Sequence, residues 1–270
     1  MKGKLIGEGR TAEIWEYGDR KVLKLYREGI PLDQVAREYK ISLYAHAQGI
    51  RTPQPFELAE VEGRSGIVFQ QIEGSSVLTL LGKSPWKAGQ YARKLAKLHY
   101  DLHMLDAGND LGLQKERLKW GIHEAPLLNE SEKQAILSYL DTLPVGGKLC
   151  HGDFHPDNIL MDGQVWIIDW MTGLAGDPAG DAARSVVMFS MGVVPEGTPG
   201  IAKLVIGFIR KRLTKEYLRE YLKLSGQTSE EIERWILPVA AARLTEWLPA
   251  AEKEQLVQEI RKRLATPTTA

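Results

Sequence analysis

The sequence has little of several features that would place a protein in a class at once. Its 270 residues include one cysteine, Cys150, so no disulfide can form within the chain. Lysine plus arginine number 35, and aspartate plus glutamate also 35, which leaves no basic excess of the kind that nucleic-acid-binding proteins carry. The start, "MKGKLIGEGR", has no apolar run of signal-peptide length, and no run in the chain approaches the roughly 18 apolar residues that span a membrane. We therefore expect a cytoplasmic protein that has neither a nucleic acid nor a membrane as its partner.

The chain does have enough apolar sequence for a sizeable core, because 43% of its residues are hydrophobic. The first seventy residues contain short apolar runs separated by turn residues, which is typical of strands. A helix is predicted between Pro31 and Gly49, where apolar residues recur at helical spacing after a proline. The runs predicted as strands are "KLIGEG", "AEIWEYG", "KVLKLYR", "PFELAEVEG" and "SGIVFQQIEG". Five strands and one helix would make a small α+β unit.

From Ser75 onward the pattern is mainly helical. Three short strands interrupt it, in "GGKLCHGD", "NILMDG" and "QVWIIDW". We place the boundary between two lobes at Glu73–Gly74, which gives an amino-terminal lobe of residues 1–73 and a carboxy-terminal lobe of residues 74–270. Helices are predicted within residues 85–105 and at about 130–141, 178–192, 200–224 and 229–264.

Two features of the amino-terminal lobe have the residue types of a phosphate site. Gly7 and Gly9, in "IGEGRTAEI", would let backbone N–H groups approach phosphate oxygens, although an ordinary hairpin also uses such glycines. Lys24 is flanked by apolar residues in a predicted strand, where a charge is costly unless it is paired. Glu38, on the following helix, is its candidate partner. A solvated lysine on an edge strand and an exposed glutamate are the alternative.

The stretch "HGDFHPDNIL", residues 151–160, places two histidines, two aspartates and an asparagine within ten positions. Asp153 and Asn158 lie five residues apart, and Asp169 follows in "IIDW". Oxygen-bearing side chains that leave neighbouring short strands can bind one Mg²⁺, which prefers few protein ligands together with phosphate oxygens and water. A turn that caps itself with Asp and Asn side chains is the alternative.

These motifs resemble those of the aminoglycoside phosphotransferase family, whose fold is similar to that of protein kinases and whose motifs are similar to those of choline kinases. The resemblance extends over nearly the whole chain, through "LAKLH" and "GDPAGDAAR". It implies an α+β bilobal protein-kinase-like fold, with a small amino-terminal antiparallel-sheet lobe and a larger, mainly helical carboxy-terminal lobe. It also implies an ATP- and Mg²⁺-dependent phosphotransferase that acts on a hydroxyl group of a small molecule.

The resemblance assigns roles to individual residues. Asp153 would be the catalytic base, and Asn158 and Asp169 would hold Mg²⁺. His155 would contact a phosphate or brace the loop. In the amino-terminal lobe, the nucleotide would be bound by Gly7, Gly9, Lys24, Glu38 and the backbone of Gln70 to Ile72.

Three points bear on the substrate. The catalytic loop reads His-Gly-Asp, and the segment between Asp169 and "GDPAGD" is short, which argues against a regulated protein kinase. An atypical protein kinase and a catalytically silent nucleotide-binding module remain as alternatives. From residue 171 to the end there are 14 basic and 12 acidic residues, so no acidic excess favours a polycationic acceptor. Trp170, Trp235 and Trp247 would be core residues or an aromatic wall of the acceptor site.

Overall fold

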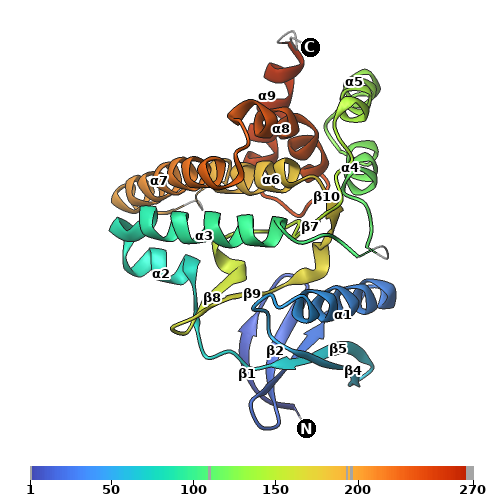
Figure 1. The fold of residues 1–270 in the computed structure, drawn as a ribbon, viewed down its shortest axis with the longest axis vertical. Coiled ribbons are helices and arrows are strands. Elements are labelled where there is room, and N and C mark those ends of the chain that lie inside the picture. Colours follow the sequence, from blue (N-terminus) through green and yellow to red (C-terminus); the bar gives the residue numbers. More distant parts are fainter. Residues whose placement is uncertain (1, 109–110, 193, 195–196, 266–270) are drawn as a thin grey trace. The chain divides into compact units, whose positions relative to one another are not determined.

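The computed structural model describes residues 2–108, 111–192, 194 and 197–265, which form two compact units (Figure 1). The first unit combines the chain up to Thr79 with a later segment, Pro156–Gly173. The second combines Leu80–His155 with the chain from Leu174 onward. The predicted lobes are continuous stretches of chain, so they differ from these units in residues 74–79 and 156–173.

The first unit is built on a five-stranded antiparallel sheet with the strand order β1-β2-β3-β5-β4. One helix, α1 (Leu32–Ala47), packs against β4 and β5. The predicted five strands and single helix are confirmed. The strands are β1 (Lys2–Glu8), β2 (Ala12–Tyr17), β3 (Lys21–Tyr26), β4 (Pro55–Val61) and β5 (Arg64–Gln70).

The side chains of β3 point alternately into two apolar clusters of the first unit. Tyr26 packs with Val35 of α1 and Ile67 of β5, while Leu23 and Leu25 belong to the second cluster. Successive side chains of a strand point to opposite faces. The spacing therefore places Lys24 on the Tyr26 face, the side on which α1 packs.

The segment Pro156–Gly173 belongs to the first unit because a short sheet and several hydrogen bonds attach it there. Its strands β8 (Ile159–Met161) and β9 (Val165–Ile167) extend β6 (Ser75–Ser76) into a three-stranded sheet. The backbone N–H of Ile167 donates to the carbonyl of Arg51 at 2.8 Å, and the Trp170 indole N–H donates to the Thr52 hydroxyl at 2.9 Å. Two single helical turns flank the sheet, η2 (Pro156–Asn158) and η3 (Trp170–Thr172).

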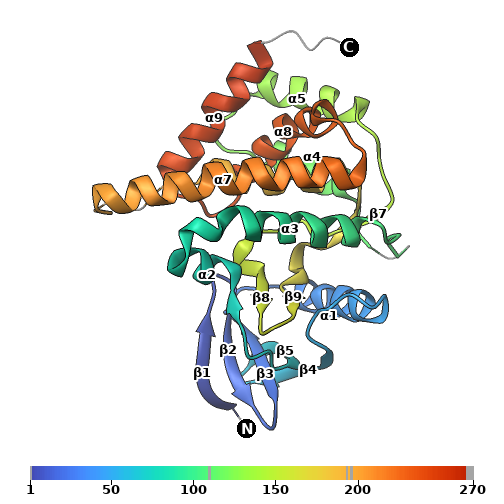
Figure 2. The ribbon, with the colours of Figure 1, turned by 60° about the vertical axis from the view of Figure 1, so that its left-hand side comes forward.

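The second unit is mainly helical (Figure 2), and its described residues include a small two-stranded sheet. Strands β7 (Lys148–Cys150) and β10 (Leu174–Gly176) pair antiparallel. Helix α3 packs along α7, and α6 packs against α8. Helix α2 (Val77–Lys83) begins in the first unit and ends in the second, and the short η1 (Pro85–Lys87) follows it. The other helices are α3 (Ala88–His103), α4 (Gln114–His123), α5 (Glu130–Thr142), α6 (Pro178–Ser190), α7 (Gly200–Ser225), α8 (Ser229–Arg243) and α9 (Ala250–Ala265). Among the described residues, no helix is long and apolar enough to cross a membrane.

One helix prediction is wrong, and two helices, α2 and α4, were missed. The expected helix 229–264 is two helices, because α8 ends at Arg243 and α9 begins at Ala250. Pro249 stands at this break, where a proline suits the first turn of a helix and disfavours helical backbone in the residue before it. Helix α4 was not predicted, since its sequence, "QKERLKWGIH", is mostly polar.

Candidate active site

In the first unit, Lys24 is held between two carboxylates. Its Nζ atom lies 2.6 Å from Oε1 of Glu38 on α1 and 2.9 Å from Oδ1 of Asp169, which follows β9. The Tyr26 hydroxyl donates to the other Glu38 oxygen at 2.5 Å, so both oxygens of this carboxylate are bound. The predicted pairing of Lys24 with Glu38 is therefore present, and the predicted metal residue Asp169 joins it.

Lys24 is charged in this setting although it is buried. Burial alone would lower its pKa, but the charges of Asp169 and then of Glu38 outweigh burial and raise the pKa above its ordinary value. Glu38 is 1% exposed, whereas the Asp169 side chain is 38% exposed. Asp169 is thus the partner whose carboxylate remains open to solvent.

Asp169 has an unusual backbone conformation. Its φ of 67° lies in the left-handed region, which aspartate tolerates better than most residues but which still costs free energy. The strain occurs where the chain leaves β9 and enters η3. The N–H of Ile168 donates to the carbonyl of Asn158 at 3.0 Å, so Asn158 lies beside the chain that leads to Asp169. The two predicted metal residues therefore come from one end of the β8–β9 hairpin.

The glycine-rich turn between β1 and β2 is closed by a hydrogen bond from the N–H of Gly9 to the carbonyl of Ala12, at 2.8 Å. A Cβ at Gly7 would come no nearer than 3.5 Å to Ile14, and a Cβ at Gly9 would meet the Ala12 oxygen at 3.4 Å. Neither glycine has a positive φ. The packing of the protein itself therefore does not require glycine at these two positions.

The backbone groups predicted to contact adenine, at the end of β5, differ in whether they are already hydrogen-bonded within the protein. The N–H of Gln70 already donates to the carbonyl of Gln54 at 2.9 Å, and that of Gln71 to Arg20 at 2.9 Å. Ile72 makes no backbone hydrogen bond with the part of the chain that the structure describes. Of the residues predicted to bind adenine, Ile72 is thus the one with a free backbone donor and acceptor.

In the second unit, the loop that carries Asp153 follows β7 and is braced by α6. The backbone N–H groups of His151 and Gly152 donate to the two oxygens of Asp181, at 2.7 and 2.9 Å. The Ser185 hydroxyl donates to the carbonyl of Phe154 at 2.8 Å. Gly152 has a φ of 73°, a conformation that a residue with a side chain rarely adopts. Asp181 therefore anchors this loop by hydrogen bonds.

Asp181 is also bound by two buried histidines of α3. Nε2 of His99 lies 3.0 Å from Oδ2 of Asp181, and Nε2 of His103 lies 3.3 Å from the same oxygen. The other ring nitrogens, Nδ1 in each case, lie 2.6 Å from the hydroxyls of Tyr217 and Tyr221 on α7. Burial lowers the pKa of His99 to about 3, so its ring is neutral and donates from Nε2 to the carboxylate. Both histidines therefore have a structural role, because they join α3 to Asp181 and to the tyrosines of α7.

The Asp153 carboxylate is bound through both of its oxygens. Nη2 of Arg184, on α6, lies 3.2 Å from Oδ1, and Nε2 of His155 lies 3.3 Å from Oδ2. Burial opposes ionisation of Asp153, but the hydrogen bond from His155 and the charge of Arg184 outweigh it and hold the pKa below its ordinary value. His155 thus contacts Asp153 within the same loop. Its two predicted roles, contact with a phosphate and bracing of the loop, both stay predictions.

Arg184 and its second partner, Glu246, were not predicted from the sequence. Oε1 of Glu246 lies 2.7 Å from Nη1 of Arg184. A signal for Arg184 was available. Arg184 follows Asp181 by three residues on a predicted helix, and residues three or four apart share one face of a helix. No comparable signal points to Glu246, which is 62 residues away from Arg184 along the chain.

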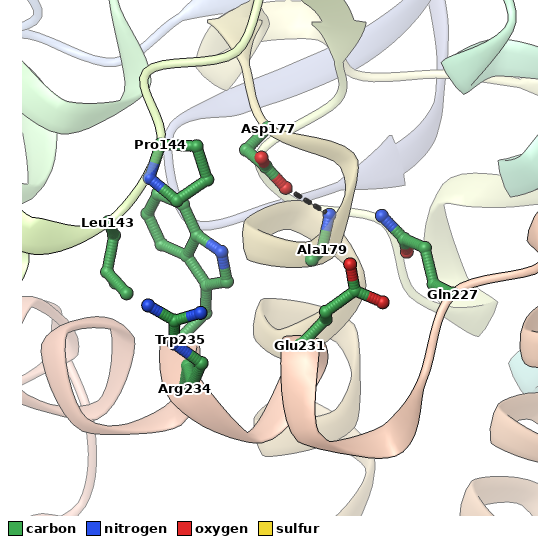
Figure 3. A pocket seen from close by; sticks show the side chains of 8 residues that line it. All are labelled: Leu143, Pro144, Asp177, Ala179, Gln227, Glu231, Arg234 and Trp235. Carbon is green, nitrogen blue, oxygen red and sulfur yellow. Dashed lines mark hydrogen bonds between the residues drawn. The ribbon is translucent and has the colours of Figure 1, made fainter. Parts of the chain in front are cut away.

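Two hollows of the second unit lie apart from the predicted site residues. Figure 3 shows a pocket of about 90 Å³ near the first turns of α6 and α8, lined among others by Asp177, Glu231 and Trp235. Ligand pockets usually measure about 300–1,000 Å³, so this pocket is too small for an acceptor molecule. An open groove of about 350 Å³ between η1 and α7 is lined by Pro85, Trp86, Leu204, Val205 and Phe208, and among the described lining residues none has a charged, hydroxyl or amide side chain to orient an acceptor hydroxyl.

The tryptophans that were considered for an acceptor wall divide into two groups. Trp170 and Trp235 are each 1% exposed and belong to the cores of their units. Trp247 is 91% exposed and directly follows Glu246. Of the three, Trp247 alone presents its ring to solvent.

The geometry of both units is that of a protein-kinase-like phosphotransferase. The sequence model of the phosphotransferase enzyme family (APH) matches residues 2–205, and the chain belongs to this family. No curated protein sequence matches it significantly.

Several solved structures share the fold at low sequence identity. A thermostable mutant of aminoglycoside phosphotransferase APH(4)-Ia is 15% identical, with 98% of this chain and 96% of that chain covered and a TM-score of 0.65. Aminoglycoside phosphotransferase APH(3'')-Id from Streptomyces rimosus is 17% identical, with 85% and 90% covered and a TM-score of 0.56. A choline/ethanolamine kinase family protein from Mesorhizobium loti is 15% identical, with 95% and 86% covered and a TM-score of 0.55. The predicted fold class and family resemblance are confirmed.

Proposed function

We propose that this phosphotransferase moves the γ-phosphoryl group of ATP to a hydroxyl group of a small molecule, with Mg²⁺ as cofactor. The observation that carries the proposal is the position of Lys24, 2.6 Å from Glu38 and 2.9 Å from Asp169. A lysine fixed by one buried carboxylate, beside a second carboxylate open to solvent, suits the binding of phosphates and of a metal ion. Among the solved structures of similar fold, the APH(4)-Ia mutant has been crystallised with AMP-PNP and hygromycin B, and APH(3'')-Id with ADP and streptomycin.

The nucleotide half of the reaction is assigned to the first unit. Lys24 would contact the α- and β-phosphates, and the turn with Gly7 and Gly9 would approach phosphate oxygens without side chains in the way. Asn158 and Asp169 offer an amide oxygen and a carboxylate, which are the oxygen donors that Mg²⁺ prefers. Bound there, Mg²⁺ would neutralise negative charge on the phosphates.

The acceptor half is assigned to Asp153 in the second unit. Asp153 would accept a hydrogen bond from the acceptor hydroxyl and so orient its oxygen toward the γ-phosphorus. The bond between that oxygen and phosphorus forms, the bond to the bridging β–γ oxygen breaks, and ADP leaves with the electron pair. The hydroxyl proton passes to Asp153. Such a transfer depends on positioning and charge neutralisation more than on a strong base.

The test is ADP release from MgATP with a panel of acceptors, in the parent chain and in Asp153→Asn. We expect the variant to bind MgATP with unchanged affinity and to lose most turnover, because only the proton acceptor is removed. Full turnover in Asp153→Asn with a good acceptor would reject the role of Asp153. Phosphorylation of proteins alone would favour the atypical protein kinase, and MgATP binding without any ADP release would favour the silent nucleotide-binding protein.

The panel also tests the charge of the acceptor. Neutral and singly charged alcohols should be better acceptors than aminoglycosides, because attracting a polycation needs concentrated negative potential. The chain from residue 171 onward has 14 basic and 12 acidic residues, which gives no such excess. A kcat/KM for any aminoglycoside in the usual enzyme range, about 10⁴–10⁸ M⁻¹s⁻¹, would reject this expectation.

A further inference from the structure

The guanidinium of Arg184 connects Asp153 to a second carboxylate. Its Nη2 atom lies 3.2 Å from Oδ1 of Asp153, and its Nη1 atom lies 2.7 Å from Oε1 of Glu246. Glu246 belongs to the connection between α8 and α9, whereas Arg184 belongs to α6. Arg184 is thus fixed at one end by Glu246 and binds Asp153 with the other.

The ion pairs continue beyond Glu246. Nη2 of Arg243 lies 3.5 Å from Oε2 of Glu246 and 3.2 Å from Oε1 of Glu252, on α9. Charges therefore alternate in sign along a series that begins at Asp153. We call Arg184, Glu246, Arg243 and Glu252 the arginine–glutamate chain.

The arginine–glutamate chain is a poor way to stabilise a fold. The side chain of Arg184 is 17% exposed and that of Arg243 is 6% exposed, so two charged groups have lost most of their water. Within the described residues, the buried atoms Nε of Arg184, and Nε and Nη1 of Arg243, have no hydrogen-bond partner. Apolar side chains of similar volume usually stabilise a fold at least as well as buried ion pairs do. A functional role explains the arrangement better than stability does.

We propose that Arg184 is a positioning residue for Asp153, and that Glu246 acts on Asp153 through Arg184. This inference rests on the proposed function, because it takes Asp153 as the group that receives the acceptor hydroxyl. Arg184 holds one carboxylate oxygen while His155 holds the other at 3.3 Å, so the plane of the carboxylate is fixed. Compensation by a permanent positive charge also keeps the carboxylate ionised. Asp153 then orients the hydroxyl and takes its proton late, as a loose transition state requires.

The experiment compares the parent chain with Arg184→Gln, Arg184→Lys, Glu246→Gln and the double variant Arg184→Gln/Glu246→Gln. The control is Arg261→Gln, which removes an arginine–glutamate pair of 2.8 Å between α9 and α5, helices that carry no predicted site residue. For each variant, kcat is measured by ADP release with the best acceptor of the panel, or with water if none is found. The dissociation constant of MgATP and the thermal unfolding midpoint are measured as well.

For Arg184→Gln we expect kcat to fall by about 10- to 100-fold, because a displacement of about 1 Å in a catalytic group has effects of this size. The dissociation constant of MgATP should stay within about twofold, since the nucleotide residues are untouched. Arg184→Lys should restore part of the loss by keeping the charge. Glu246→Gln should lose less, and the double variant should equal Arg184→Gln, because Glu246 has no separate route to Asp153. Arg261→Gln should behave as the parent.

Several results would overturn the inference. The first is a kcat of Arg184→Gln within twofold of the parent, and the second is a double variant whose losses multiply. If Arg184→Gln fails to fold, Glu246→Gln is the variant that tests the inference, because it leaves Arg184 in place. An unchanged kcat of Glu246→Gln then rejects the inference. Asp153→Asn distinguishes a failure of this inference from a failure of the proposed function. If Asp153→Asn loses turnover and Arg184→Gln does not, the inference alone fails; if Asp153→Asn keeps full turnover, or the parent releases no ADP, the proposed function fails with it.

Discussion

His99 makes the stability of the protein depend on pH. Its ring is completely buried, and burial lowers its pKa to about 3, against the usual value near 6.5 in an unfolded chain. A histidine with a lowered pKa gives its full stabilisation above the unfolded pKa and loses it as the pH falls. We expect the free energy of unfolding to decrease between about pH 6.5 and 3, with a slope approaching about 1.4 kcal/mol per pH unit from this group.

Denaturant unfolding at several pH values between 7 and 4 measures this slope. His99→Gln should be less stable at pH 7 and show a shallower slope, because glutamine can occupy the space but does not titrate. His123→Gln is the control, since His123 is exposed at the end of α4. An equal slope in the parent and in His99→Gln would show that another group causes the dependence.

At the scale of elements, α7 consists of two different halves. Its first turns expose Leu204 to 76% and Phe208 to 56%, whereas Leu213, Tyr217 and Tyr221 in the later turns are buried. Leu213→Ala should therefore lower the free energy of unfolding by about 2–5 kcal/mol, while Leu204→Ala should change it by less than about 0.5 kcal/mol. Chemical denaturation of the two variants side by side gives the comparison. Similar losses would mean that the exposed turns are covered in solution.

Some elements and contacts of the fold could be predicted from the sequence, and others could not. Lys24 and Glu38 were paired correctly because a strand followed directly by a helix leaves few partners for a buried lysine. Helix α4 was missed because two polar residues of its first turn, Gln114 and Lys115, are buried, and Lys115 donates to the carbonyl of Leu143 at 2.7 Å. Apolar periodicity cannot reveal a helix whose buried side includes polar groups that are satisfied by distant backbone.

The candidate site could be predicted where its residues are close in sequence. Asp153, Asn158 and Asp169 lie within seventeen positions, and their short strands were recognised. The arginine–glutamate chain could not be predicted, because Glu246 reaches Arg184 only through the break between α8 and α9. The sequence pattern had indicated one continuous helix over that break, which would have put Glu246 on a regular helix surface.

At the scale of the whole molecule, MgATP should stabilise the folded chain. A ligand present at 100 times its dissociation constant adds about 2.7 kcal/mol to the free energy of unfolding. Asp169→Ala should lose the part of this gain that depends on Mg²⁺, because one predicted metal ligand is removed. Thermal unfolding with ATP, in the presence and absence of Mg²⁺, measures the difference. Asp157→Ala is the control, since Asp157 is exposed on the neighbouring turn; a loss of the same size in Asp157→Ala would contradict the metal role of Asp169.

The chain crosses between its two compact units three times, after Thr79, His155 and Gly173. Because the first unit is encoded by two separate stretches of the gene, it cannot be obtained as one continuous fragment. A gene fragment that ends at residue 79 would encode Lys24 and Glu38 but not Asp169, so its lysine would lose one of its two carboxylates. A portable form of the first unit would have to include residues 156–173 on the same polypeptide, joined by a designed linker. In evolutionary terms, a single recombination event cannot exchange the first unit alone without separating Lys24 from Asp169.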